Sequence, residues 1–210
     1  KDVAKMLSEV VKHDEYFEYS KIWTDEIDHG GRKTEITNTN KLVRFYEGCD
    51  GGKTGYTAES GFCLAGTAKR GNMRLIAVVI KGESSKSRFA DVSSAFNYGF
   101  DNYSSKAALD DEKELSVTAK VEKGIKKDVK IIPENDVYVF SKKNEKQDIV
   151  IDFEPYNKIK APIKKGDKVG CLIVYKNGVE TGRTNALAAE TVNKKTYFDY
   201  VRDVARSWTI

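Results

Sequence analysis

One short segment constrains this chain more than any other: Asp50-Gly51-Gly52-Lys53-Thr54-Gly55, followed at once by a run of strand-forming residues. The run from Tyr56 to Ala68 predicts a strand, Lys69 to Asn72 a tight turn, and Met73 to Ile80 a second strand. The β-branched second strand predicts that this hairpin is central and buried. A lysine and a threonine at the start of a strand bring a cation and a hydroxyl beside backbone N–H groups, which together suit an anionic ligand.

The segments around this hairpin predict an α/β layer. Residues 2–12 carry apolar side chains at helical spacing, and Gly30-Gly31 marks a turn between two strands within 13–50. After Ser84 or Ser85, either of which suits a helix N-cap, apolar residues recur at steps of three and four, namely Phe89, Val92, Phe96 and Phe100. This helix is expected to pack across the preceding strands.

The second half of the chain has a different sequence pattern, in which short strand-forming segments replace the helix-forming ones. Residues 104–114 are polar and turn-rich, which predicts a domain boundary, so a first domain is expected over 1–106 and a second over 107–195. Short alternating strands are predicted at 115–121, 128–132, 136–141, 148–154, 168–176 and 179–184. Asn177-Gly178 between the last two is a strong two-residue hairpin signal. Strands at this spacing predict a small all-β sandwich.

The end of the chain, residues 196–210, predicts an amphipathic helix. Tyr197, Val201, Val204 and Trp208 share one face, and charged residues surround the rest. An aromatic-rich amphipathic helix can lie in a membrane interface, but it can equally dock on the β-rich domain or on a partner chain. The residues alone leave these alternatives open.

Composition excludes several classes of function. The 210 residues carry a net charge of only +4, with lysines scattered among acids, whereas a nucleic-acid binder concentrates its basic residues on one face. No window approaches the ~20 apolar residues of a membrane-spanning helix. Two distant histidines and three cysteines without a CxxC pair do not form a zinc ligand set, so neither a metal nor a cofactor is expected.

The cysteines read most simply as structural or surface residues. Cys63 and Cys171 lie in apolar runs, which predicts small buried side chains. Cys49 precedes the glycine-rich segment and is expected to be a loop thiol.

In the order of its parts the chain resembles the D-alanyl-D-alanine carboxypeptidases, the low-molecular-weight penicillin-binding proteins of peptidase family S11. The resemblance is specific across 38–100 and spans the whole chain in outline. The stretches that carry it are Asn38-Thr39-Asn40-Lys41-Leu42, Asp50 to Thr57, Ser60-Gly61-Phe62, Met73 to Val79 and Ser87-Arg88-Phe89. Lys-Thr-Gly on a strand is one of three short motifs shared by active-site-serine penicillin-binding proteins and class A β-lactamases.

The resemblance implies a function and a set of site residues. Lys53 and Thr54 of the Lys53-Thr54-Gly55 motif would bind the terminal carboxylate of a peptidoglycan stem peptide, the backbone N–H of Tyr56 would donate to the oxyanion, and Arg88 would lie near the carboxylate of the leaving D-alanine. The reaction would release the terminal D-alanine through an acyl-serine intermediate, which β-lactams would trap. The resemblance also implies a membrane-associated protein on the outer face of the cell membrane.

Two motifs of that family are missing from the 210 residues. No serine is followed three positions later by lysine, and no Ser-x-Asn occurs. The chain also begins at Lys1 without a signal peptide. We therefore expect a C-terminal portion of the enzyme, inactive by itself and dependent on a companion N-terminal segment for its nucleophile. A non-catalytic cell-wall binding or scaffold module is the alternative.

A nucleotide-binding P-loop is a poor fit to the same residues. Gly52-Lys53-Thr54 ends a Walker-type pattern, but Glu47 stands where that pattern requires its first glycine. A P-loop also leads from a strand into a helix, whereas a strand is predicted after Thr54.

Overall fold

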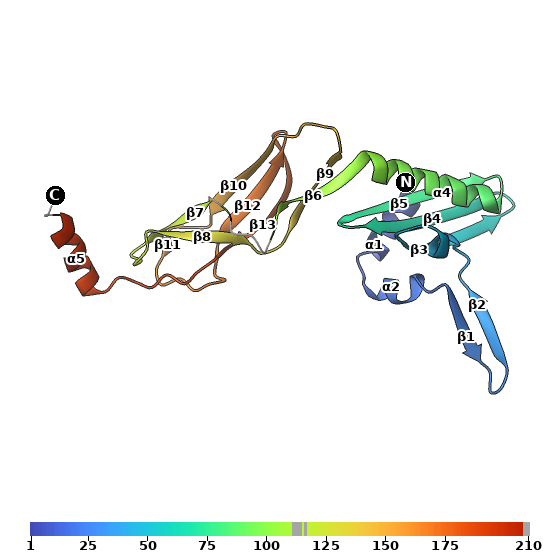
Figure 1. The fold of residues 1–210 in the computed structure, drawn as a ribbon, viewed down its shortest axis with the longest axis horizontal. Helices are drawn as coiled ribbons and strands as arrows, with labels where there is room; N and C mark the ends of the chain where they lie inside the picture. The colour runs from blue at the N-terminus through green and yellow to red at the C-terminus, as the bar shows by residue number, and fades with distance from the viewer. Residues whose placement is uncertain (111–114, 116, 208–210) are drawn as a thin grey trace. The chain divides into compact units, whose positions relative to one another are not determined.

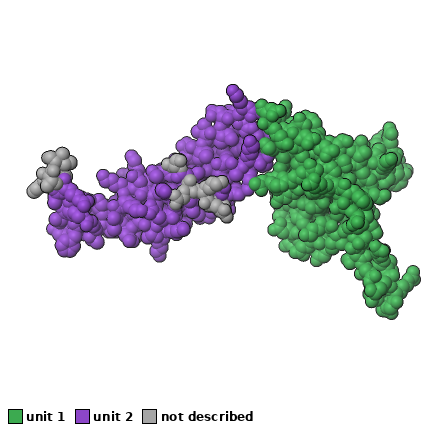
Figure 2. All heavy atoms as spheres, viewed as in Figure 1, with its two compact units in different colours: residues 1–104, 142–144 green, residues 105–141, 145–210 purple. Residues whose placement is uncertain are grey.

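The computed structural model describes residues 1–110, 115 and 117–207, which divide into two compact units (Figure 2). Unit 1 comprises residues 1–104 and 142–144, and unit 2 comprises 105–141 and 145–210. Part of the polar stretch predicted as a domain boundary is a strand, β6 (Tyr103–Leu109), and residues 111–114 of that stretch lie outside the described residues.

Unit 1 is built on a three-stranded antiparallel sheet with the order β3-β4-β5 and a long helix, α4, against it (Figure 1). The bounds are β3 Cys49–Thr57, β4 Gly61–Arg70, β5 Met73–Gly82 and α4 Ser85–Asn102. Before the sheet come α1 Asp2–Val10, α2 Glu15–Ser20, the hairpin β1 Thr24–Asp28 and β2 Lys33–Thr37, and α3 Leu42–Phe45. The predicted first helix, the Gly30-Gly31 hairpin and the predicted α4 are confirmed, whereas α2 and α3 were not predicted.

The core of unit 1 lies between α4 and the sheet. Val92 and Phe96 of α4 are fully buried, as is Ala68 of β4, and Leu64 is 1% exposed. Ser84 begins the helix with a capping box, in which its hydroxyl accepts from the Ser87 N–H and the Ser87 hydroxyl accepts from the Ser84 N–H. The predicted three- and four-residue spacing therefore corresponds to the face that packs on the sheet.

The strand boundaries around the glycine-rich segment differ from the prediction. Residues 56–68 are not one strand, because Lys53-Thr54-Gly55 lies inside β3 and a turn at 58–60 separates β3 from β4. The prediction failed because the glycines of β3 have low strand propensity and because the turn signal, Gly61 with a φ of 58°, is itself the first residue of β4. The prediction that the strand at 73–80 is central and buried is also wrong. The central strand is β4, whereas β5 lies at the edge of the described sheet, with Ile80 58% exposed.

Unit 2 consists mostly of short strands, as predicted. Its six-stranded sheet has the order β10-β12-β13-β8-β7-β11, and β6 pairs with β9 in a second, two-stranded sheet. The bounds are β7 Thr118–Glu122, β8 Asp128–Pro133, β9 Val137–Lys142, β10 Ile149–Pro155, β11 Ile159–Lys160, β12 Lys168–Lys176 and β13 Val179–Ala188. All six predicted strands are present, β6 and β11 are additional, and the sandwich architecture stays a prediction.

The Asn177-Gly178 signal is confirmed as the turn between β12 and β13. Both residues have positive φ, 51° and 77°, as a two-residue turn that matches strand twist requires. Along β9 buried and exposed residues alternate, with Val139 1% exposed and Phe140 50% exposed. This alternation matches a strand with one face on the core.

The chain ends in the predicted helix, α5 (Tyr197–Ser207). Its apolar side chains are exposed, with Tyr197 at 77%, Phe198 at 80% and Val201 at 49%. Trp208, predicted on the same face, lies outside the described residues. Within the described part of the chain, no helix combines the length and apolar character needed to cross a bilayer.

The cysteine assignments are partly wrong. Cys49 is the first residue of β3 and is 8% exposed, so it is not a loop thiol, while Cys63 and Cys171 are only half-buried. Burial raises the pKa of the Cys49 thiol to about 11, outweighing its interactions with the Gly51 backbone and the Asn40 side chain, which act the other way. The strand that carries the glycine-rich segment thus begins inside the core.

This burial predicts slow alkylation of Cys49. At pH 8 a thiol with a pKa near 11 is about one part in a thousand thiolate, and only the thiolate reacts. Treatment of the folded chain with iodoacetamide at pH 8 should modify Cys63 and Cys171 before Cys49, as followed by peptide mass spectrometry. In 8 M urea, as a control, all three should react at similar rates. Equal rates in the folded chain would contradict the buried position of Cys49.

Candidate active site

The site predicted from Lys53-Thr54-Gly55 lies at the edge of the unit 1 sheet. The N–H of Gly52 donates to the Tyr16 hydroxyl at 2.8 Å, which directs it toward α2 and away from β4. The register from Gly51 to Thr57 against β4 is unbroken, so N–H directions alternate along it. The N–H groups of Thr54 and Tyr56 therefore face the same edge as that of Gly52, where the described residues add no further strand.

The motif side chains lie along this open edge. The Lys53 ammonium is exposed and donates to the Thr54 carbonyl at 3.0 Å. The Thr54 hydroxyl lies 2.9 Å from the Thr39 hydroxyl, and Gly55 presents bare backbone. The Tyr56 ring is 62% exposed and packs on Phe62 across the hairpin, with ring centroids 4.6 Å apart. A cation, a hydroxyl and outward N–H groups thus share one edge, as an anionic ligand requires.

Arg88 approaches the same stretch from α4. It is 9% exposed, and its Nη1 donates to the carbonyls of Gly55 at 3.2 Å and Cys63 at 3.4 Å. Its guanidinium lies between the rings of Phe62 and Phe89, 5.5 and 4.9 Å from their centroids. The structure therefore brings together all the predicted site residues, and it shows Arg88 holding the backbone of β3 and β4 in place.

Arg88 also retains unused hydrogen-bonding capacity. Its Nη2 donates to the Ser85 hydroxyl at 3.3 Å, while its Nε is buried and has no partner among the described residues. A buried donor without a partner costs free energy, which is commonly tolerated at functional sites.

The segment before β3, Asn38-Thr39-Asn40, supports the site through three side chains. Asn38 donates to the carbonyls of Ser20 and Ile22, at 3.1 and 3.0 Å. Asn40 is fully buried and donates to the Gly51 carbonyl at 3.1 Å. In the sequence, this segment is noted only as one of the stretches that resemble the carboxypeptidase family, and no role is predicted for its residues. Its chemical signal is two amides flanking a hydroxyl, a combination suited to binding backbone on both sides.

Asp50 at the start of the motif is held by Arg74. Two guanidinium nitrogens reach its two carboxylate oxygens at 2.9 and 2.8 Å, and one of them also donates to the Thr67 hydroxyl at 2.8 Å. The guanidinium also lies over Phe17, 4.3 Å from the ring centroid. This bidentate pair ties β3 to β4, β5 and the α2 segment.

Two glycines allow these close approaches. Gly52 has φ of +129°, and a Cβ there would lie 2.2 Å from the Ala65 carbonyl oxygen. A Cβ on Gly51 would lie 2.8 Å from the hydroxyls of Ser20 and Tyr16. Neither position has room for a side chain.

We predict that Gly52→Ala destabilises unit 1 by about 2–3 kcal/mol, because the substitution adds backbone strain to a contact with a carbonyl that cannot move aside. Gly55→Ala is the matched control in the same strand: its Cβ would meet only Cys63, at 3.8 Å. Urea unfolding followed by circular dichroism measures both variants. Equal stabilities for the two would show that the close approach at Gly52 does not constrain the fold.

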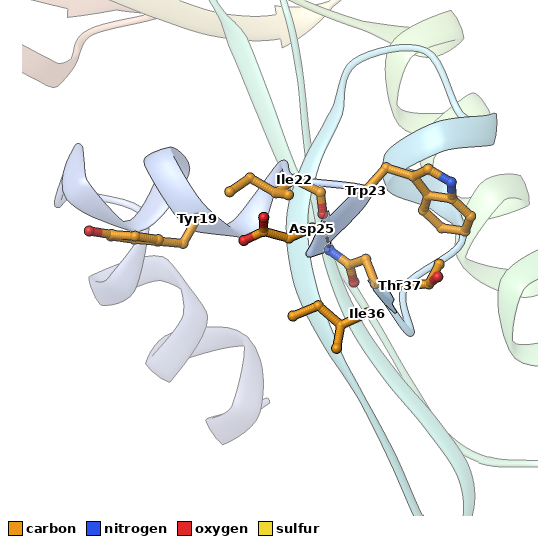
Figure 3. Close-up of a pocket in the computed structure, with 7 residues that line it drawn as sticks. Tyr19, Ile22, Trp23, Asp25, Ile36 and Thr37 are labelled. Carbon is orange, nitrogen blue, oxygen red and sulfur yellow. Dashed lines mark hydrogen bonds between the residues drawn. The ribbon is translucent and has the colours of Figure 1, made fainter. Parts of the chain in front are cut away.

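A hollow of about 270 Å³ lies at the base of the β1–β2 hairpin (Figure 3). Its lining is mainly apolar and aromatic, formed by Tyr19, Ile22, Trp23, Asp25, Ile36, Thr37 and Asn38. The last of its lining residues, Asn38, directly precedes Thr39 in the sequence. No group of three or more potential metal ligands gathers anywhere in the described ranges.

Both halves of the chain match known protein families. Residues 1–84 match the D-alanyl-D-alanine carboxypeptidase family, peptidase S11, and residues 103–194 match the C-terminal domain of penicillin-binding protein 5. The chain is thus similar to the D-alanyl-D-alanine carboxypeptidases over its first part and to a penicillin-binding protein domain over its second. The family match covers β3 and its Lys53-Thr54-Gly55 motif.

Individual relatives match over much of the chain. It is 31% identical over 210 residues to D-alanyl-D-alanine carboxypeptidase DacF of Bacillus subtilis, covering 99% of this chain and 54% of that protein. A peptidoglycan synthesis regulatory factor of Streptococcus pneumoniae has the same fold, with a TM-score of 0.70 at 22% identity over 88% of this chain and 54% of that one. Penicillin-binding protein 5 of Haemophilus influenzae is also similar in structure, with a TM-score of 0.62 at 24% identity. The match covers 88% of this chain and 53% of that one. The chain thus spans about half the length of these proteins.

Proposed function

We propose that this chain forms the carboxylate-binding and oxyanion-binding side of a serine-type D-alanyl-D-alanine carboxypeptidase that acts on peptidoglycan stem peptides. The observation that carries the proposal is the open edge of β3, where Lys53, Thr54 and the outward N–H of Tyr56 lie together. The family match and the relatives' names support the reaction class.

Each residue has a defined task in this proposal. Lys53 and Thr54 bind the terminal carboxylate, which fixes the scissile amide along the strand edge. A serine attacks the carbonyl of the penultimate D-alanine, and the N–H of Tyr56 donates to the oxygen on which negative charge develops. The C–N bond breaks, D-alanine leaves with a proton, and water hydrolyses the acyl-serine ester. Arg88 holds the Gly55 carbonyl and so positions the peptide unit that carries this N–H.

The nucleophile has to come from a Ser-x-x-Lys segment, which these 210 residues do not contain. By itself the chain should therefore form no acyl-enzyme. The alternative is a cell-wall binding or scaffold module without catalysis. The two functions differ in one observable, which is covalent capture of a β-lactam when the serine segment is supplied.

The test is acylation by benzylpenicillin, read as intact mass under denaturing conditions. The chain alone should give no adduct, and the chain combined with a segment supplying Ser-x-x-Lys and Ser-x-Asn should give one adduct on that segment. Tyr56→Pro should slow acylation by about 10²–10³-fold, because it removes one oxyanion donor from an edge where proline leaves the ladder intact. Tyr56→Phe, which keeps the N–H, is the matched control. Peptidoglycan binding without any adduct would favour the scaffold alternative.

We also propose that α5 anchors the protein to the outer face of the cell membrane. The exposed aromatic and aliphatic face of the helix supports this, as do Arg202 and Arg206 among its polar residues. Docking of α5 on unit 2 or on a partner chain is the competing arrangement.

Vesicle sedimentation separates these arrangements. The chain should bind vesicles of mixed phosphatidylglycerol and phosphatidylcholine, and Tyr197→Glu should lower the partition coefficient about tenfold, because the ring no longer contributes buried apolar area. Val179→Glu is the matched control, since Val179 is 68% exposed and lies on β13 outside the helix. No binding, or equal loss in both variants, would exclude the anchor.

A further inference from the structure

The hydroxyl of Thr39 lies 2.9 Å from that of Thr54, the motif residue assigned to carboxylate binding. Thr39 is held from both sides, because Asn38 and Asn40 anchor the segment to the backbone of Ser20, Ile22 and Gly51. The Asn38 carboxamide oxygen also accepts from the Asn40 N–H at 2.9 Å, which closes a turn around Thr39. The position of the Thr39 hydroxyl is therefore set by backbone contacts that do not depend on its own hydrogen bond.

Proton counting gives this contact a consequence for ligand binding. A hydroxyl carries one proton and accepts through its lone pairs. While Thr54 donates to Thr39, it can present only lone pairs to a carboxylate, which repel it. Thr54 can donate to a carboxylate only if its proton turns outward, and Thr39 then has to donate to Thr54 to keep the contact. In the structure Thr54 is the donor and Thr39 the acceptor, so carboxylate binding has to reverse the direction of this hydrogen bond.

We infer that Thr39 is a positioning residue for carboxylate recognition: its hydroxyl donates to Thr54 and so orients the Thr54 proton toward the terminal carboxylate of the ligand. The inference rests on the proposed function of Lys53 and Thr54. Two hydroxyls in series end on an anion, an arrangement in which each hydrogen bond polarises the next. Lys53 supplies the positive charge at this edge, and the Thr39–Thr54 pair sets the direction in which the Thr54 hydroxyl donates its hydrogen bond.

The position of Thr39 separates this role from a structural one. Thr39 is exposed, so its replacement leaves no buried polar atom without a partner. Thr39→Val keeps the shape and removes only the hydroxyl, and the flanking asparagines keep the segment in place. The unfolding midpoint in urea should therefore not change, whereas recognition of a carboxylate should.

The experiment compares two ligands that differ only in this group. Benzylpenicillin has a free carboxylate, and its methyl ester does not. With the chain combined with a segment that supplies Ser-x-x-Lys and Ser-x-Asn, the second-order rate constant of acylation is measured by intact mass for each ligand. The ratio of the two rate constants reports carboxylate recognition alone, because any general loss of activity cancels.

Thr39→Val should lower this ratio about three- to tenfold, the value of one ordinary hydrogen bond. Thr39→Ser, which restores the hydroxyl, should return the ratio to that of the wild type. Thr54→Val should lower it further, and adding Thr39→Val to Thr54→Val should have no additional effect, because the relay is already broken. Thr34→Val, at an exposed position on β2, is the matched control and should leave the ratio unchanged.

Three results would overturn the inference. An unchanged ratio in Thr39→Val would show that its hydroxyl does not orient Thr54. An equal loss with both ligands would assign Thr39 to the fold and not to recognition. If neither ligand acylates the wild-type combination, the proposed function itself fails and the inference fails with it, an outcome distinct from the first two.

Discussion

The close approach of backbone at Gly51 and Gly52 is the constraint on which unit 1 depends. At this point β3 meets the Ala65 carbonyl of β4 on one side and the hydroxyls of Tyr16 and Ser20 on the other. Any side chain would separate these elements, and α2, the Asn38–Asn40 segment and β4 would lose their common contact with β3. The Lys53-Thr54-Gly55 motif follows directly, so contacts made to the residues before it help to fix its position, together with Arg88 at the Gly55 carbonyl. The motif itself is thereby free to face a ligand.

Local chemistry allowed much of the fold to be predicted. Asn177-Gly178 specified a turn because few other residue pairs adopt two consecutive positive φ values. The spacing of Val92, Phe96 and Phe100 specified the face of α4 because an exposed apolar stripe of that length is unfavourable. In both cases the signal and its physical cause lie within a few residues. Such elements can be predicted without knowledge of the rest of the chain.

The failures share a different cause. β3 was missed as a strand because its stability comes from neighbours far away in the sequence, among them Arg74 at Asp50 and Asn40 at Gly51. β6 was read as a polar boundary because Ser104, Ser105 and Lys106 resemble a loop until a partner strand, β9, satisfies their backbone. The site residues Lys53 and Thr54 came from a resemblance, whereas Thr39 needed coordinates, since nothing in a sequence places two threonines fifteen residues apart within hydrogen-bonding distance.

A binding site made from the edge of a sheet carries a risk of self-association. Unpaired N–H and C=O groups attract any extended chain, including another copy of the same strand. In β3 the risk is limited by length, because Tyr16 and Ser20 already occupy the backbone groups of Gly52 and Asp50. Among the described residues, the stretch of this edge from Thr54 to Thr57 has no such contact with α2, and the Lys53 ammonium donates to the Thr54 carbonyl there. This edge therefore offers few unpaired backbone groups to another strand, so the contacts that position the motif also limit pairing of β3 with a second copy of itself.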